Sequence, residues 1–250
     1  MTTAGAVSHT REDRIRVYVW DAAVRTFHWL IAGGIVVLSI TGLYQAAPFQ
    51  GSGGAATPGF LMGWMKTVHS YAAIVFTISV LARVVWMFLG PPQASWREFI
   101  PVTRRRWRSF YKTLRYYTFL SVDNIATVGH NAVAGAAYTA VFFLYLVMIV
   151  TGLTLYGASA SVDSPMHVFN ALGPMLGGLQ LARFIHHGVM WLLIGFTVHH
   201  LYSAVLTSKL ERTGELDSMF SGNKFLQPEE FETALENEGL RKGASSHARR

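Results

Sequence analysis

Four apolar stretches, each about 20 to 25 residues long, restrict what this sequence can fold into, and they lie at residues 27–46, 67–90, 132–156 and 184–207. Each stretch is long enough to cross the roughly 30 Å hydrocarbon core of a bilayer as an α-helix. Charged residues make up only 14 % of the chain, compared with roughly 25 % in an average soluble domain. The sequence therefore predicts an all-α integral membrane protein, a bundle of four transmembrane helices.

Basic residues alternate between the segments that flank these stretches. Arginines and lysines precede the first stretch, separate the second from the third and follow the fourth, whereas residues 47–65 and 157–182 contain none. This is the positive-inside pattern, and it places both termini in the cytoplasm and the chain in the inner (cell) membrane. It also explains the net charge of +7 without nucleic-acid binding. We therefore predict a cytoplasmic N-terminal segment (1–26), a transmembrane domain (27–208) with a basic cytoplasmic loop (91–131), and a cytoplasmic tail (209–250).

Histidines inside these stretches are the candidate functional residues, because ionisable side chains within a membrane span are costly and usually face the bundle interior. The fourth stretch contains four of them. At about 100° and 1.5 Å per residue, His186 and His200 share one helix face to within about 40° and lie about 21 Å apart along the axis. His187 and His199 point elsewhere, and we interpret them as interface residues or as residues that support the ligands.

The direction of each helix pairs these histidines with histidines of other stretches. His69 should lie at the depth of His186, near the outer surface, and His28 at the depth of His200, near the inner surface. Two facing neutral imidazoles are what a six-coordinate b-type haem requires. We therefore predict two haems b, with these four histidines as iron ligands. The chain has no cysteine, which excludes thiolate-held iron–sulfur clusters and covalently attached haem.

Two arginines are predicted to pair with haem propionates. Arg83 follows His69 by 14 residues, so it should share the face of His69 at the depth of the inner haem, where a buried cation needs a counter-charge. Its alternative role is to extend toward the cytoplasmic interface. Arg183, one turn before His186, is the corresponding candidate at the outer haem.

Several motifs surround these histidines: VYVWDAAVRTFHW with a following TG, FLMGWMKTVHSYAA, YYTFLS, VGHN, MIVTGLTLYG and IHHGVMWLLIGFTVHHLY. Together they resemble the b-type cytochrome subunit of membrane-bound nickel–iron hydrogenases, and the resemblance extends from about Val17 to Phe225. The haem ligands of that family fall on the same four histidines. The sequence departs from the family pattern at Thr26, Ala132 and residues 183–185, none of which is a ligand.

The resemblance implies a membrane-anchoring subunit of a hydrogen:quinone oxidoreductase. Such a subunit passes electrons from the iron–sulfur small subunit of a periplasmic hydrogenase, which also has a nickel–iron large subunit, to quinone in the bilayer. The complex is expected to be a higher oligomer. The chain itself would perform no hydrogen chemistry, because it lacks the cysteines that bind nickel and iron.

The analogous formate dehydrogenase subunit implies a quinone site near the cytoplasmic haem, for which His130 and Asn131 are candidates. The alternative is that this pair only caps the third helix. Two other functions stay open at this point. The bundle could serve a formate dehydrogenase or another periplasmic reductase, although FLMGW and GLTLYG favour hydrogenase. The histidines could instead relay protons in a transporter, which would show no haem absorption.

Overall fold

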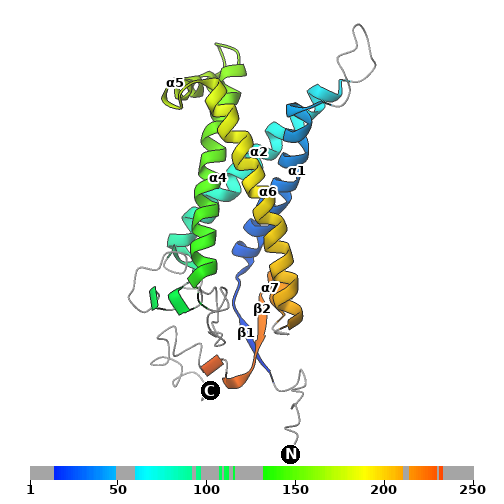
Figure 1. The fold of residues 1–250 in the computed structure, drawn as a ribbon, viewed down its shortest axis with the longest axis vertical. Helices are drawn as coiled ribbons and strands as arrows, with labels where there is room; N and C mark the ends of the chain where they lie inside the picture. Colours follow the sequence, from blue (N-terminus) through cyan, green and yellow to red (C-terminus); the bar gives the residue numbers. More distant parts are fainter. Residues whose placement is uncertain are drawn as a thin grey trace, which may run out of the picture. The chain divides into compact units, whose positions relative to one another are not determined.

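The computed structural model describes residues 14–48, 60–91, 94–96, 107–108, 110–112, 115, 132–210, 214–229 and 231–232. Within these ranges the chain is mostly helical, and four of its helices are long and apolar enough to cross a membrane. These helices, shown in Figure 1, are α1 (Ala22–Ala46), α2 (Leu61–Leu89), α4 (Ala132–Ser159) and α6 (Leu179–Leu210). The prediction of a mostly helical protein with four candidate membrane spans is therefore confirmed.

The helices extend beyond the apolar stretches of the sequence. Helix α1 begins five residues before residue 27, and α2 begins six residues before residue 67. At the start of α1 the carboxylate of Asp21 accepts a hydrogen bond of 2.7 Å from the Val24 amide, which satisfies one of the free N–H groups of the first turn. Hydropathy marks only the part of a helix that suits lipid, whereas capping decides where the helix starts.

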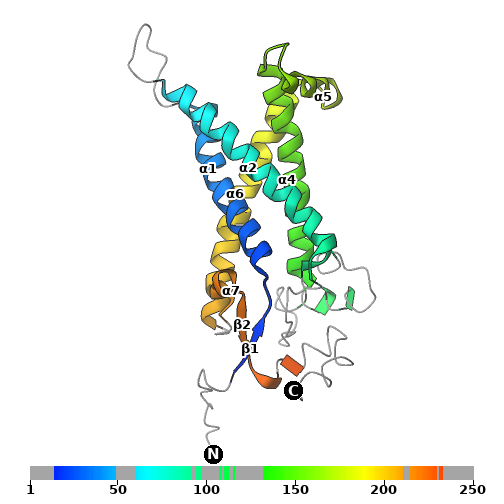
Figure 2. The same ribbon diagram turned by 180° about the vertical axis from the view of Figure 1, so that it is seen from behind.

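The chain forms two compact units, one of which comprises residues 26–88 and 139–202 and holds the greater part of the four long helices. Each of these helices contributes two buried residues, spaced i and i+4 on one face, to a common apolar cluster made of Ile31, Ile35, Phe76, Val80, Val141, Tyr145, Val189 and Leu193. Figure 2 shows the side of the bundle formed by α1, α2 and α4. Phe76 of α2 joins these three helices, because it lies against Gly34 of α1 and its ring meets Tyr145 of α4 edge-on at 5.3 Å.

Two short elements connect α4 to α6 in the same unit, namely the 3-10 helix η4 (Pro165–Ala171) and α5 (Leu172–Met175). Helix α4 and η4 come very close together at Gly157. A Cβ atom at this position would lie 2.7 Å from the Asn170 amide nitrogen and 2.9 Å from the Met166 carbonyl oxygen. Both neighbours are backbone atoms and cannot move aside cheaply, so the contact requires glycine.

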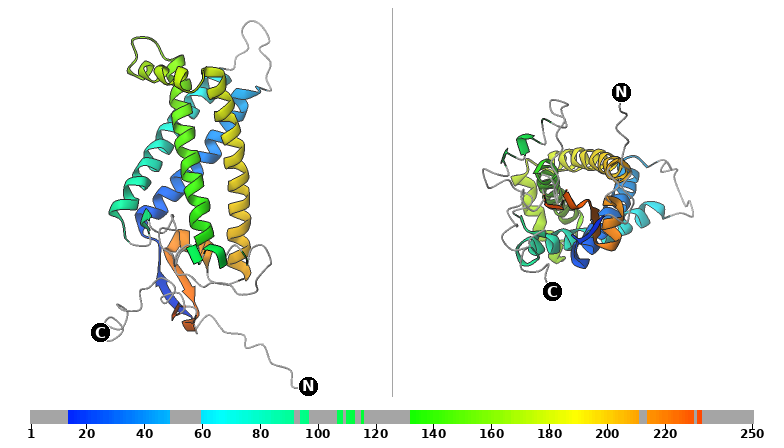
Figure 3. Two further views of the ribbon diagram at one scale, coloured as in Figure 1. Left: turned by 60° about the vertical axis from the view of Figure 1, so that its left-hand side comes forward. Right: turned by 90° about the horizontal axis from the view of Figure 1, so that it is seen from below.

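The second unit contains a small sheet that the prediction of an all-α fold missed. Strand β1 (Ile15–Tyr18) pairs antiparallel with β2 (Asn223–Leu226), which follows the short helix α7 (Glu215–Ser221), and the two strands lie side by side in Figure 3. Gly222, with φ of 83°, ends α7 and begins the strand. The all-α prediction is wrong here because each strand has only four residues, a length at which the alternation of a strand is hard to recognise.

Candidate functional site

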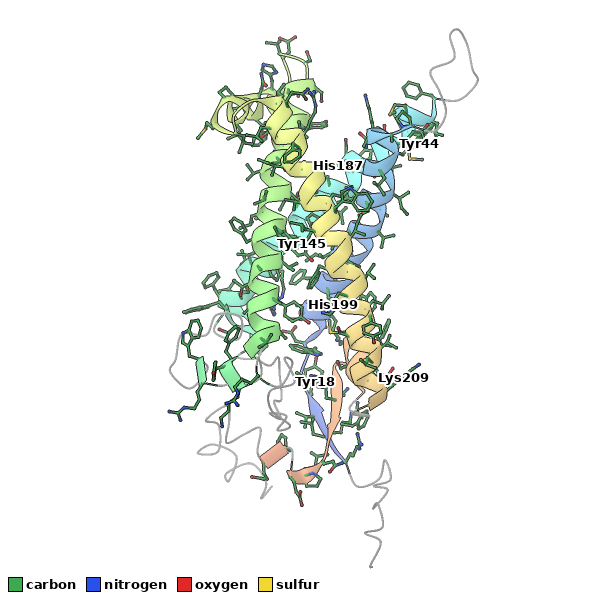
Figure 4. The ribbon with its side chains drawn as sticks, in the orientation of Figure 1. Tyr18, Tyr44, Tyr145, His187, His199 and Lys209 are labelled. Carbon is green, nitrogen blue, oxygen red and sulfur yellow. The ribbon has the colours of Figure 1, made fainter. Side chains whose placement is uncertain are left out.

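The four histidines of α6 fall into two classes by exposure. His186 and His200 are half-buried, whereas His187 and His199 are exposed, and Figure 4 labels these exposed residues at two levels of α6. The imidazole of His187 has a local partner, because Trp191 Nε1 donates a hydrogen bond of 3.2 Å to His187 Nε2. The two half-buried imidazoles are the ones that histidines of other helices approach.

His69 of α2 and His186 of α6 lie within electrostatic range of each other. Met190 of α6 also lies near His69, because both side chains approach Gly42 of α1. A Cβ atom built on Gly42 would lie 3.4 Å from His69 Cε1 and 3.7 Å from Met190 Sδ. Met190 is one helical turn after His186. The structure therefore brings this predicted pair together inside the bundle.

Each imidazole of this pair is hydrogen-bonded to a buried threonine on a neighbouring helix. Thr41 Oγ1 of α1 lies 2.8 Å from His69 Nδ1, and Thr151 Oγ1 of α4 lies 2.8 Å from His186 Nδ1. The threonines are only 4 % and 1 % exposed. All four long helices therefore contribute to this site.

The direction of these hydrogen bonds follows from the threonine hydroxyls. Thr41 Oγ1 donates to the Val37 carbonyl oxygen at 2.7 Å, and Thr151 Oγ1 donates to the Val147 carbonyl oxygen at 2.7 Å. A hydroxyl has one proton to donate, so toward histidine each threonine oxygen is an acceptor. With the hydroxyls donating to these carbonyls, the matching tautomer carries the proton on Nδ1. In a neutral imidazole this leaves Nε2 as the unprotonated nitrogen, the one able to bind a metal.

A glycine follows each of these threonines and leaves room for the imidazole. A Cβ atom on Gly152 would lie 3.3 Å from His186 Cε1, close to the 3.4 Å distance at Gly42. The dipeptides Thr41-Gly42 and Thr151-Gly152 thus form two similar histidine seats on α1 and α4. This role was not predicted from the sequence. The only available signal was the occurrence of the same dipeptide in the first and third apolar stretches.

The second predicted pair, His28 of α1 and His200 of α6, is held differently. The two ring centroids lie 6.3 Å apart. The ring of Trp29 meets His28 edge-on at 5.0 Å, and Phe196 stacks on His200 with centroids 5.6 Å apart and planes 8° from parallel. Nδ1 of His28 is buried and has no hydrogen-bond partner among the described residues.

The apolar cluster of the bundle contributes an aromatic residue at an intermediate level. Figure 4 shows Tyr145 of α4 between the levels of His187 and His199. Its ring is in edge-on contact with Phe76 and Phe142 at 5.3 and 5.6 Å. The side chains of this cluster carry no formal charge.

The remaining predicted site residues are two arginines and the pair His130-Asn131. Arg83 is buried, with 6 % exposure. Arg183 is exposed and donates a hydrogen bond of 2.9 Å to Gln180 Oε1. His130 and Asn131 lie outside the described residues. Within the described ranges no three histidine or carboxylate side chains gather into a metal site.

These observations allow the fit of b-type haem to be tested. Metal–imidazole bonds of about 2 Å on either side of one ion place two ring centroids roughly 6 to 6.5 Å apart, and the centroids of His28 and His200 lie at 6.3 Å. In the other pair the threonine contacts leave both Nε2 atoms free for iron. These contacts fit the binding of b-type haem by histidine.

Comparison with known proteins gives the family. The sequence profile described as prokaryotic cytochrome b561 matches residues 19–222. The chain is 36 % identical over 224 residues to the probable Ni/Fe-hydrogenase B-type cytochrome subunit of Cupriavidus necator, which covers 88 % of this chain and 91 % of that protein. It is 34 % identical to the protein of the same name from Bradyrhizobium diazoefficiens, with coverage of 84 % and 87 %. It is 31 % identical to the probable Ni/Fe-hydrogenase 1 B-type cytochrome subunit of Escherichia coli K12, with coverage of 82 % and 89 %. The chain belongs to the prokaryotic cytochrome b561 family.

Proposed function

We propose that this chain is the membrane-anchoring electron-transfer subunit of a periplasmic nickel–iron hydrogenase, and that it connects the iron–sulfur small subunit to membrane quinone through two haems b. Two facing pairs of histidines in a four-helix bundle carry this proposal. The names of the relatives support the choice of partner. Membership of a cytochrome b561 family implies b-type haem, and haem iron with two imidazole ligands exchanges one electron at a time.

The four histidines would hold the two haems. His69 and His186 are the proposed ligands of one haem, and His28 and His200 of the other. The topology expected from the basic segments puts the first pair near the periplasm and the second near the cytoplasm. We call these the outer and the inner pair. In this orientation both termini are cytoplasmic, and residues 27–208 form the transmembrane domain.

Residues of the bundle keep the sites separate from water and from each other. The cluster around Phe76 and Tyr145 fills the bundle with apolar side chains. Arg83 stays our candidate for a propionate partner, because a buried guanidinium needs a negative charge close by. Arg183 is the second candidate, at the outer haem, and its guanidinium donates a hydrogen bond to Gln180. His130 and Asn131 stay candidates for the quinone site.

The test is a dithionite-reduced difference spectrum of the purified protein and of histidine-to-alanine variants. We expect two b-type haems in the wild type, and loss of one haem after substitution of any one of the four proposed ligands. His187→Ala and His199→Ala are the matched controls, since these side chains are exposed neighbours of the ligands; both should retain two haems. Loss of a haem in His199→Ala but not in His200→Ala would contradict the ligand assignment.

The partner is tested separately from the haems. Under the proposed function, a nickel-containing large subunit and an iron–sulfur subunit co-purify with this chain from membranes. Co-purification of a formate dehydrogenase instead would keep the electron-transfer role and change the donor. A wild-type protein without any haem absorption would favour a proton-coupled transporter that uses its histidines as relays.

A further inference from the structure

We propose that Thr41 and Thr151 are positioning residues that fix the outer pair of histidines in one tautomer and lower the reduction potential of the outer haem alone. This inference rests on the proposed function, because it assumes that His69 and His186 hold iron. It assigns a role to two side chains that do not touch the metal. Their effect would be exerted through the imidazole rings.

The two threonine hydroxyls are buried. Thr41 and Thr151 are 4 % and 1 % exposed, so water does not compete for their oxygens. In the proposed arrangement each hydroxyl donates its proton to a carbonyl oxygen of its own helix, which lies at 2.7 Å. The oxygen that remains can only accept, and it lies 2.8 Å from histidine Nδ1 in both cases. The two histidines are therefore fixed with the proton on Nδ1.

A hydrogen bond donated from Nδ1 also changes the electron density of the ring. It raises the basicity of the opposite nitrogen, as second-sphere acceptors do for metal-bound histidines in general. A more basic ligand stabilises ferric iron relative to ferrous iron, and this lowers the reduction potential. Both ligands of the outer pair receive this contribution from neutral acceptors of the same type.

The inner pair lacks the same arrangement on His28. Nδ1 of His28 is buried without a hydrogen-bond partner among the described residues, and its ring contacts are aromatic. The threonine effect should therefore be confined to one haem of the two. A lower potential at the outer haem favours electron transfer from the outer haem to the inner one.

The experiment compares redox titrations of the purified cytochrome carrying Thr41→Val or Thr151→Val with that of the wild type. Valine keeps the shape of threonine and removes the acceptor. The matched control is Thr154→Val, because Thr154 is also fully buried and donates to its own helix, to Val150 at 2.8 Å. The variants Thr41→Ser and Thr151→Ser restore the hydroxyl and should recover the wild-type potential.

We expect each valine variant to shift the equilibrium of one haem toward the reduced form by about tenfold, which is about 59 mV for one electron. The reduction potential of the other haem should not change, and Thr154→Val should change neither potential. In a His28→Ala background, which removes the inner haem, the shift should persist in the haem that remains. The low-spin ferric signals in electron paramagnetic resonance should change for the same haem, since they report the ligand field of the imidazoles.

The possible outcomes separate this inference from the function on which it rests. Two haems with unchanged potentials in both valine variants would overturn the inference and leave the proposed function intact. Loss of one haem in a valine variant, with retention in the serine variant and in Thr154→Val, would support it, because only the acceptor is missing. If Thr154→Val lost one haem to the same extent, the inference would be overturned. Absence of haem from the wild type would overturn both.

Discussion

The sharpest consequence of the histidine seats concerns Gly152, where a single methyl group would press on a proposed haem ligand. A Cβ atom at this position would lie 3.3 Å from His186 Cε1. Carbon atoms in ordinary contact lie about 3.5 to 4.0 Å apart. In Gly152→Ala the imidazole must therefore move by a few tenths of an ångström, away from α4.

This displacement acts directly on the ligand, because His186 is held on the same side by its 2.8 Å contact with Thr151. A moved ring either loses this hydrogen bond or leaves its position opposite His69. Inserting a methyl group into a packed interior costs about 1 to 3 kcal/mol. At about 1.4 kcal/mol for each factor of ten, haem binding at the outer pair should weaken roughly five- to one-hundredfold.

The assay is the haem-to-protein ratio of the purified variant during dilution or detergent washing, with each haem followed by its reduced spectrum. The matched control is Gly188→Ala, since a Cβ on Gly188 would meet no atom within 4 Å although it is two residues from His186. The two variants gain the same methyl group in a helix. If both release haem equally, or neither does, the steric explanation is refuted.

Two further glycines give predictions on stability. Gly157→Ala would put a Cβ atom 2.7 Å from the Asn170 amide nitrogen; we expect it to displace η4 from α4, at a cost of about 1 to 3 kcal/mol, and to lower the midpoint of thermal unfolding. Gly222→Ala would force a side chain into a backbone conformation with φ of 83° and a contact of 2.6 Å with Tyr18. The tail after α6 should then be cleaved faster in limited proteolysis while both haems are retained, and an unchanged cleavage rate would contradict the strain argument.

The helices were predictable from sequence because apolar length is a local property. The ends were not, because they depend on single capping residues such as Asp21 and on how far a helix continues past the hydrophobic region. The small sheet is the extreme case. Ile15 pairs with Leu226, and nothing in either four-residue strand specifies a partner so distant in the chain.

The histidine pairs were predictable in part because a 14-residue spacing and the alternation of helix direction are both visible in the sequence. The threonine partners were not, because a threonine inside a helix usually satisfies its hydroxyl with a carbonyl oxygen of the preceding turn. Thr41, Thr151 and Thr154 all do this. Only the packing of neighbouring helices distinguishes Thr41 and Thr151, whose oxygens also contact a histidine Nδ1.

The same contact between a Thr-Gly dipeptide and a histidine occurs twice in the bundle, although the sequence has no evident internal repeat. Thr41-Gly42 on α1 receives a histidine from the next long helix, α2, and Thr151-Gly152 on α4 receives one from its own successor, α6. Each histidine of the outer pair is therefore positioned within a pair of successive long helices. The inner pair is arranged otherwise, since His28 and His200 join the first long helix to the last.

Because the two pairs join different helices, a group bound to each pair should affect the stability of the bundle differently. A group that binds both His28 and His200 connects α1 to α6, which are far apart in the sequence, and a ligand that binds only the folded chain stabilises it by mass action. A group on His69 and His186 connects two helix pairs that already hold their own histidines through Thr41 and Thr151. Haem on the inner pair should therefore stabilise the bundle more than haem on the outer pair.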